Sequence, residues 1–227
     1  FTALGVEVLQ GQGRLAGPRR VEVALNAGGT RSLEGKALVL ATGSGPLVPP
    51  VPGLAEAGYL TNETVFSHPV QPRRLCVLGG GPIGLELGQA FARLGSQVTV
   101  VEKLPRVLPR EDADAAAVVA RALQADGIAL RTGLQAVRVQ GGPGGKRVLC
   151  RSTGQPAAPE QTLEVDEILV AVGRRAHLQG LGLETLGVAT EQGRIRVDAW
   201  MRTSVRSIYA CGDAVGPYQF THMANQQ

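Results

Sequence analysis

The sequence is poor in cysteine and in aromatic residues, and it has no long apolar segment. Its three cysteines, Cys76, Cys150 and Cys211, lie far apart along 227 residues. This spacing argues against a disulfide framework or a zinc knuckle and fits a reducing compartment, so we expect a cytoplasmic protein without a metal site. No apolar run approaches the roughly 20 residues of a membrane-spanning helix, so we expect no membrane association.

Clustered positive charge is also missing, although the formal net charge is +4. The 23 lysine and arginine residues are scattered along the chain, with only short pairs such as Arg19-Arg20. Nucleic-acid binding normally requires a basic patch or stripe, so we expect no nucleic-acid partner. What the sequence does have is a globular balance of 44% hydrophobic and 19% charged residues, which excludes an intrinsically disordered chain.

The first part of the chain alternates short apolar runs with glycine. Runs at 6–9 and 21–25 predict strands, and Leu38–Leu40 predicts an apolar strand that is buried on both faces. Residues 46–53 contain four prolines, which predict an extended connector. The chain begins at Phe1 without an initiator methionine, and we expect it to be a piece of a longer protein.

From residue 75 the pattern changes to alternating strands and helices. The predicted strands are 75–78, 98–101, 128–130, 136–140, 147–151, 162–164 and 167–172. The predicted apolar face of the first helix consists of Ile83, Leu87, Phe91 and Leu94, and that of the second consists of Val118, Val119, Ala122 and Leu123. Strands joined through helices of this length form parallel units. The predicted fold class is therefore α/β, with a Rossmann-like parallel sheet and a β-meander.

The strongest motif is Gly79-Gly80-Gly81-Pro82-Ile83-Gly84, which follows a predicted buried strand and opens a helix. A G-x-G-x-x-G sequence in this context predicts a dinucleotide site. Gly79 would permit the tight turn, Gly81 would let a pyrophosphate reach N–H groups at the helix start, and Gly84 would let helix and strand pack closely.

Glu102 ends the next predicted strand, 18 residues after Gly84. A carboxylate at this place accepts hydrogen bonds from the adenosine ribose and repels a 2′-phosphate. We therefore expect NAD(H) to be preferred over NADP(H). Lys103 and Arg106 follow closely, and they would weaken this discrimination if they reached the phosphate.

Four ordered motifs resemble the pyridine nucleotide-disulfide oxidoreductases, the two-dinucleotide flavoproteins that include dihydrolipoamide dehydrogenase, glutathione reductase and mercuric reductase. Ala41-Thr42-Gly43 is similar to the family segment where the chain leaves the FAD domain. Residues 79–86 resemble the NAD loop, and Ala171-Val172-Gly173-Arg174 resembles the return to the FAD domain. Ala210-Cys211-Gly212-Asp213 resembles the second flavin motif.

This resemblance implies that residues 70–173 form an NAD-binding domain between two portions of an FAD-binding domain, 1–69 and 174–227. The implied NAD contacts are Gly79, Gly80, Gly81, Pro82, Ile83, Gly84, Glu102 and Gly173. The implied FAD contacts are Thr42, Gly43, Asp213, Phe220, Thr221 and His222. Glu86 resembles the glutamate near the nicotinamide and the flavin, which makes it the candidate catalytic residue.

The activity implied by the resemblance is hydride transfer from NADH to FAD, and then electron transfer to a disulfide or metal-type acceptor. The first flavin-binding glycine loop and the C-x-x-x-x-C pair of the family are not found in these residues. We therefore expect this piece to bind NADH weakly, to retain no FAD, and to be inactive alone. Its expected partners are the missing parts of its own chain, within a homodimeric full-length protein.

Two other functions fit the same motifs. One is a thiol-free NADH:flavin reductase of the ferredoxin reductase or NADH dehydrogenase type, because these branches share the motifs. The other, from a different class, is a stand-alone NAD-binding or sensing module without turnover. A C-x-x-x-x-C pair in the preceding sequence would favour the disulfide branch.

Overall fold

The computed structural model describes residues 2–142, 144–155 and 157–227, so Phe1, Pro143 and Pro156 lie outside the description. The chain forms two compact units: unit 2 is Pro46–Gly173, and unit 1 combines the residues up to Gly45 with Arg174–Gln227. The sequence assigned residues 46–69 to the first flanking portion, but they pack with unit 2. The reason is that Leu54 and Leu60 are buried among its core side chains.

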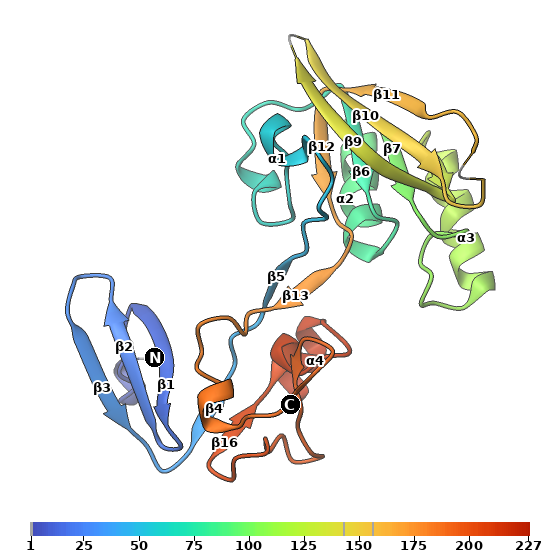
Figure 1. Ribbon diagram of the computed structural model, residues 1–227. Helices are drawn as coiled ribbons and strands as arrows, with labels where there is room; N and C mark the ends of the chain where they lie inside the picture. The colour runs from blue at the N-terminus through green and yellow to red at the C-terminus, as the bar shows by residue number, and fades with distance from the viewer. Residues whose placement is uncertain (1, 143, 156) are drawn as a thin grey trace. The chain divides into compact units, whose positions relative to one another are not determined.

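The centre of unit 2 is a four-stranded parallel sheet in the order β12-β6-β7-β8 (Figure 1). Its strands are β12 (Glu167–Val170), β6 (Arg74–Leu78), β7 (Gln97–Glu102) and β8 (Ala129–Thr132). The sequence predicted all four strands and the parallel pairing. The expected strand at 167–172 is two residues shorter in the structure, because it ends at Val170 and the chain bends at Val172.

Both faces of this sheet are buried, which explains the continuous apolar runs of its strands. Leu75 and Val77 of β6 pack with Leu85 and Leu123 on the side of the helices. The alternate side chains of β6 pack with the β9–β10–β11 sheet, with Cys76 buried in the same core cluster as Val148. The result is three layers, with helices on one face of the parallel sheet and a β-meander on the other.

The helices of unit 2 are α1 (Leu54–Ala57), α2 (Pro82–Arg93) and α3 (Ala113–Ala125). The meander consists of β9 (Leu134–Gly142), β10 (Gly145–Ser152) and β11 (Gln161–Val165), paired antiparallel in the order β11-β10-β9. These three strands confirm the predicted short strands and extend them at their ends.

The predicted apolar faces of the two long helices are partly wrong. In α2 the buried residues are Gly84, Leu85 and Gly88, whereas Leu94 follows the helix and is 69% exposed. The glycines bring the helix backbone close to the sheet, because a Cβ on Gly84 would lie 3.1 Å from Cγ1 of Val77. In α3, Ala116 and Leu123 are buried, but Val118 and Val119 are exposed.

Unit 1 contains an antiparallel sheet of β1 (Gly11–Gly17), β2 (Arg20–Leu25) and β3 (Thr30–Glu34). It also contains three two-stranded pairs: β4 (Leu38–Leu40) with β16 (Ile208–Ala210), β5 (Ser44–Pro46) with β13 (Arg174–Ala176), and β14 (Thr190–Glu191) with β15 (Arg194–Ile195). A core cluster that includes Leu15, Leu40 and Ile208 joins the two chain segments of this unit.

Three expectations for unit 1 are corrected by the structure. Residues 6–9 form no strand, and the first strand begins at Gly11, where a Cβ would lie 2.3 Å from the carbonyl oxygen of Ala24. The strand Thr30–Glu34 has only one apolar residue and was not predicted. Val39 is 64% exposed, so Leu38–Leu40 is buried on one face rather than on both.

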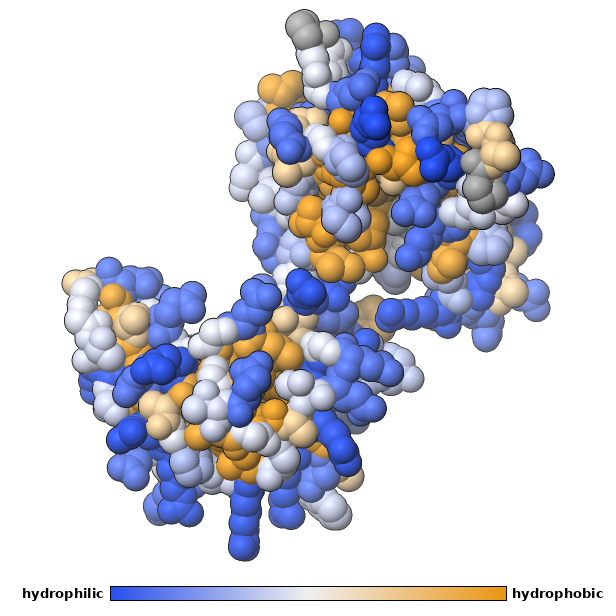
Figure 2. All heavy atoms as spheres, viewed as in Figure 1, coloured by the Kyte–Doolittle hydropathy of each residue, from blue (hydrophilic) through white to orange (hydrophobic). Residues whose placement is uncertain are grey.

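The remaining short elements are α4 (Thr221–Gln226) and 3₁₀ turns at Thr2–Leu4, Val65–Ser67, Glu184–Leu186 and Gly212–Ala214. Apolar residues reach the surface on both units in the view of Figure 2, and the exposed large ones include Val39 and Trp200 in unit 1 and Phe66 in unit 2. Among the described residues, no helix combines the length and the apolar character needed to cross a bilayer.

Candidate functional site

The loop between β6 and α2 places its glycines in different surroundings. Gly79 has a φ of 109°, and a Cβ there would lie 2.4 Å from the carbonyl oxygen of Ala171. A Cβ on Gly84 would lie 2.3 Å from the carbonyl oxygen of Gly79. At Gly81 φ is −83°, and a Cβ would meet no atom within 4 Å. The fold itself therefore requires Gly79 and Gly84, whereas the space above Gly81 is open.

This open space lies at the N-terminus of α2. Gly81 is the N-cap residue and provides no side-chain cap, and Pro82 occupies the first turn without an N–H group. The N–H groups at the start of a helix have no partners within the helix. Because Pro82 has none, Gly81, Ile83 and Gly84 carry these groups here. Together with the helix dipole they favour a negatively charged group.

Glu102 lies at the end of β7, where it binds the glycine loop directly. Its side chain is buried, and Oε2 accepts a hydrogen bond of 2.7 Å from the N–H of Gly80. Its Oε1 accepts one of 2.8 Å from the N–H of Leu104. A carboxylate oxygen has two lone pairs, so Glu102 keeps capacity to accept hydrogen bonds from a ligand.

The segment after β7 also contacts the glycine loop. The N–H of Leu108 donates a hydrogen bond of 2.8 Å to the carbonyl oxygen of Gly80, and Val107 is buried beside it. Lys103 is exposed. Arg106 is half-buried and directs its guanidinium to the backbone carbonyls of its own segment.

Two further residues of the predicted NAD site lie in the same unit. Gly173 follows β12, the strand that pairs with β6, and its carbonyl oxygen accepts a hydrogen bond of 2.9 Å from the N–H of Leu47. Carboxyl ends of neighbouring parallel strands meet at one edge of a sheet, so Gly173 and Gly79 share that edge. Glu86 is exposed on α2, one turn after its start.

The predicted flavin contacts in unit 1 meet in the same way. β4 and β16 are parallel neighbours, so Thr42 and Gly43 after β4 and Asp213 after β16 lie at one sheet edge. The structure adds two residues that the sequence interpretation missed, Ser44 and Arg174. The hydroxyl of Ser44 donates a hydrogen bond of 2.5 Å to Oδ2 of Asp213.

Arg174 completes this cluster. Its Nε donates to Oγ of Ser44 at 2.7 Å and its Nη2 to the carbonyl oxygen of Ser44 at 2.6 Å. Nε also lies 3.5 Å from Oδ2 of Asp213. Ser44 directly follows the glycine that ends one recognised motif, and Arg174 is the last residue of another, directly after its glycine. A polar residue immediately after a strand-end glycine was therefore the signal that could have found them.

Thr42 has a buried polar atom without a partner. Its Oγ1 makes no hydrogen bond, and among the described residues it is the only buried side-chain oxygen or nitrogen of which this is true. Buried polar groups are normally hydrogen-bonded. The neighbouring Gly43 has a φ of 66° and open space where a Cβ would be, so a group placed there could bind Thr42.

The predicted contacts at the flavin ring surround the start of α4. Phe220 is partly exposed and its ring stacks on that of His222, with 5.5 Å between centroids and 9° between planes. Thr221 begins the helix. A Cβ on Gly212 would lie 3.5 Å from Cβ of Ala224, so α4 packs against the turn that carries Asp213.

The three cysteines differ in burial. Cys76 and Cys150 are buried in one core cluster of unit 2, and Cys211 is half-buried in unit 1. Burial raises the pKa of Cys76 strongly and raises the pKa of Cys150 to about 11. Cys76 and Cys150 thus pack as small buried apolar residues, whereas Cys211 does not.

Comparisons with known proteins agree across the whole chain. The sequence model of the family described as pyridine nucleotide-disulphide oxidoreductase matches residues 2–227. The chain is 40% identical over 225 residues to a dihydrolipoyl dehydrogenase of Thermus scotoductus, covering 98% of this chain and 47% of the relative. It is 38% identical over 223 residues to a mercuric reductase of Streptomyces lividans, covering 97% and 46%. The chain spans about half the length of the curated relatives it matches.

Solved structures also match nearly the whole of this chain and about half of their own length. LpdA from Mycobacterium tuberculosis superposes with a TM-score of 0.87 and 31% identity, over 100% of this chain and 49% of that chain. The HOCl-induced flavoprotein disulfide reductase RclA from Escherichia coli superposes with a TM-score of 0.86 and 29% identity, over 97% and 48%. Both solved structures therefore share the fold of this chain over about half of their own length.

Proposed function

Because the chain belongs to the pyridine nucleotide-disulphide oxidoreductase family, we propose that it is the nucleotide-binding part of an NADH-dependent, FAD-containing oxidoreductase. The observation that carries this proposal is the position of Gly81. The fold gives no packing reason for a glycine there, and the open space lies against the N–H groups that begin α2. A dinucleotide diphosphate fits that space and that charge.

NADH rather than NADPH is the proposed coenzyme because of Glu102. Its buried carboxylate ends β7 beside the glycine loop, and it would accept hydrogen bonds from the hydroxyls of an adenosine ribose bound there. A 2′-phosphate would meet that negative charge in a partly desolvated place. The guanidinium of Arg106 donates to three carbonyls of its own loop, so of the two nearby cations only the exposed Lys103 would be available to a 2′-phosphate.

Unit 1 would hold the FAD. The unpartnered Oγ1 of Thr42, the open space at Gly43 and the carboxylate of Asp213 are suited to the hydroxyl groups and phosphates of this cofactor. Ser44 and Arg174 would fix Asp213 for that contact. The chemistry that FAD supplies when bound is acceptance of a hydride from nicotinamide and onward electron transfer to a disulfide or metal-type acceptor. Glu86, exposed on α2, is kept as the candidate catalytic residue beside the nicotinamide.

Titration of the 227-residue chain with NADH tests the glycine loop. Hydrogen bonds to charged groups are worth about 1.5–3 kcal/mol, so we expect Gly81→Val to weaken NADH binding about tenfold or more. The matched control is Gly154→Val, because a Cβ on Gly154 also meets no atom within 4 Å and its φ is not positive. Equal NADH affinity of wild type and Gly81→Val would disprove the proposed site.

The coenzyme preference is tested separately with NADPH. The wild-type chain is expected to bind NADH more tightly than NADPH, and Glu102→Gln to reduce this ratio because the charge that repels the 2′-phosphate is removed. Equal affinities of the wild-type chain for the two coenzymes would remove the NADH assignment and leave the dinucleotide site intact.

A further inference from the structure

We propose that Arg106 is a positioning residue of the dinucleotide site, which orients the N–H group of Gly81 through the backbone of Leu108. The proposal rests on the proposed function, because it concerns the same glycine loop. It adds a residue outside the G-x-G-x-x-G motif, and it assigns to that residue a task other than contact with the coenzyme.

Arg106 binds its own loop at three points. Nη1 donates to the carbonyl oxygen of Leu108 at 2.7 Å, and Nη2 donates to those of Pro109 at 3.0 Å and Glu111 at 2.7 Å. A guanidinium offers its donors in a rigid planar fork. Three carbonyls that converge on one fork are held together, so Arg106 closes residues 106–111 into a compact turn.

The turn contains a backbone conformation that needs support. Leu108 has a φ of 47°, in the left-handed region that residues with a side chain seldom adopt. Such residues persist where their surroundings hold them. Here the carbonyl of Leu108 is bound by Arg106 and by the N–H of Glu111 at 3.1 Å.

The orientation of Leu108 matters because its N–H group points at the glycine loop. It donates a hydrogen bond of 2.8 Å to the carbonyl oxygen of Gly80. That carbonyl and the N–H of Gly81 belong to one planar peptide group. A bond that fixes the direction of the Gly80 carbonyl therefore also fixes the direction of the Gly81 N–H.

The other peptide group of Gly80 is fixed as well. Its N–H donates to Oε2 of Glu102 at 2.7 Å. Gly80 has no side chain to restrict its backbone. Its conformation is instead restricted by the hydrogen bonds from Leu108 and to Glu102. Loss of the bond from Leu108 leaves the Gly80–Gly81 peptide free to rotate, and a diphosphate would then have to order it on binding.

This role differs from that of a ligand for a 2′-phosphate. A residue that contacts the 2′-phosphate affects NADPH alone, whereas a residue that orients the Gly81 N–H affects every ligand with the diphosphate. Arg106 is therefore expected to change the affinities for NADH, NADPH and ADP by the same factor.

The experiment compares Arg106→Gln with wild type by calorimetric titration of ADP, NADH and NADPH at a temperature at which both proteins are folded. We expect about tenfold weaker binding of all three, with an unchanged NADH-to-NADPH ratio. Arg106→Lys keeps the charge but not the planar fork, and should fall between the two. Arg110→Gln is the matched control, because Arg110 is an exposed arginine of the same loop, and it should bind like wild type.

Several outcomes would overturn the proposal. A lower melting temperature of Arg106→Gln with wild-type ADP affinity would show a structural role only, and a selective loss of NADPH affinity would show contact with the 2′-phosphate. If Arg106→Gln fails to fold, wild-type ADP affinity of Arg106→Lys overturns the proposal instead. If the wild-type chain itself binds no ADP or NADH, the proposed dinucleotide site is wrong, and this inference falls with it.

Discussion

Cys76 and Cys150 are thiols that the interior of unit 2 keeps in the protonated form. Both are fully buried, and burial raises the pKa of each because a thiolate loses its hydration there. The thiolate is the nucleophile in thiol chemistry. These two residues are therefore poor nucleophiles in the folded chain, whereas Cys211 is half-buried.

We expect a thiol reagent at mildly alkaline pH to modify Cys211 in the folded chain, and to modify Cys76 and Cys150 only after unfolding. The measurement is a titration with a disulfide reagent before and after addition of denaturant. In Cys211→Ser the fast phase should disappear. A fast phase that survives this substitution would show that unit 2 opens to solvent under native conditions.

Arg106, Ser44 and Arg174 share a further property at the scale of single residues. Each donates hydrogen bonds close to a glycine of a proposed site: Arg106 to backbone carbonyls, Arg174 to the hydroxyl and carbonyl of Ser44, and Ser44 to the carboxylate of Asp213. Such residues set the direction of the groups that would touch a ligand. We therefore expect substitutions of these residues to change the affinity for a ligand rather than the rate of the chemical step.

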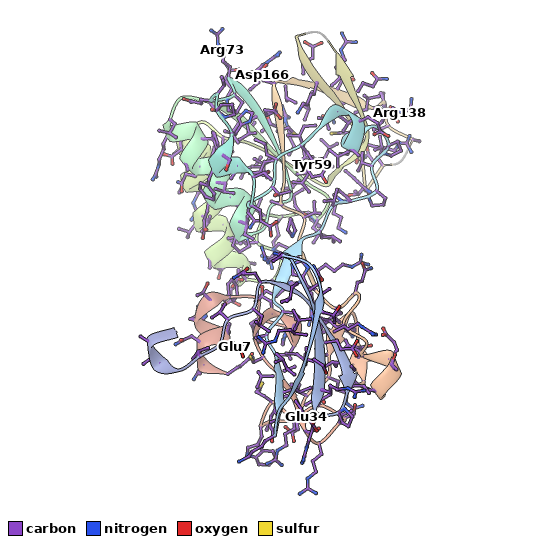
Figure 3. The ribbon with its side chains drawn as sticks, turned by 90° about the vertical axis from the view of Figure 1, so that its left-hand side faces the viewer. Glu7, Glu34, Tyr59, Arg73, Arg138 and Asp166 are labelled. Atoms are coloured by element: carbon purple, nitrogen blue, oxygen red, sulfur yellow. The ribbon has the colours of Figure 1, made fainter. Side chains whose placement is uncertain are left out.

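At the scale of elements, Asp166 and Arg74 join the starts of two strands that carry the candidate site. Asp166 accepts hydrogen bonds from the Nη2 of Arg74 at 2.7 Å and from its N–H at 2.8 Å, and Asp166 directly precedes β12 while Arg74 begins β6. Figure 3 shows Asp166 beside the neighbouring Arg73 at one end of unit 2. The side-chain hydrogen bond of Arg74 holds the pKa of Asp166 below its usual value.

We expect Asp166→Asn to lower the free energy of unfolding at neutral pH by about 1 kcal/mol, because both side chains are partly exposed. A carboxyl whose pKa is lowered by folding stabilises the protein above its ordinary pKa of about 3.9, and this contribution disappears as the pH falls through that value and below. Denaturant unfolding at several pH values should therefore bring wild type and Asp166→Asn together in acid. A constant difference at all pH values would contradict this account.

The sequence predicted the elements whose burial is complete and missed those that depend on close backbone contact. The strands of the parallel sheet and the meander were predicted because their apolar residues are buried on both faces or alternate. The face of α2 was partly wrong because glycine at 84 and 88 contributes no hydrophobicity, although it forms the contact with the sheet. Thr30–Glu34 pairs in register with β2 while having almost no apolar residues.

The residues of the candidate site also differ in whether the sequence could predict them. The glycine loop and Glu102 are a local motif, so their juxtaposition follows from the sequence through the strand–turn–helix context. Ser44 bonds to Arg174 and Asp213 across separations of 130 and 169 residues, and no local pattern reports such contacts. Arg106 was noticed as a nearby charge, but its carbonyl partners depend on the fold of its loop.

At the scale of the whole molecule, the chain forms one continuous unit and one discontinuous unit. Unit 2 is a single stretch with two buried clusters of its own. Unit 1 needs both of its segments, because its core joins Leu15 and Leu40 from the first with Ile208 from the second. The G-x-G-x-x-G loop of the sequence lies in unit 2, so the proposed FAD contacts of unit 1, Thr42, Asp213 and their neighbours, include no glycine loop of that kind.

We therefore expect the 227-residue chain, purified alone, to carry far less than one equivalent of FAD while still binding NADH. The measurement is the visible absorbance band of the purified protein, followed by addition of FAD and gel filtration. As a control, release by heat and spectroscopy of the supernatant would detect flavin with a shifted spectrum. A nearly stoichiometric flavin band would show that unit 1 binds the cofactor without further sequence.

The buried carboxylate of Glu102 has a practical consequence for coenzyme engineering. Exchanging a strand-end acid for a small neutral residue is a direct way to admit a 2′-phosphate, but here it would also deprive two backbone N–H groups, those of Gly80 and Leu104, of their acceptor. A buried donor left without an acceptor costs about 1–3 kcal/mol. A redesign that replaces Glu102 therefore has to provide other acceptors for these two N–H groups.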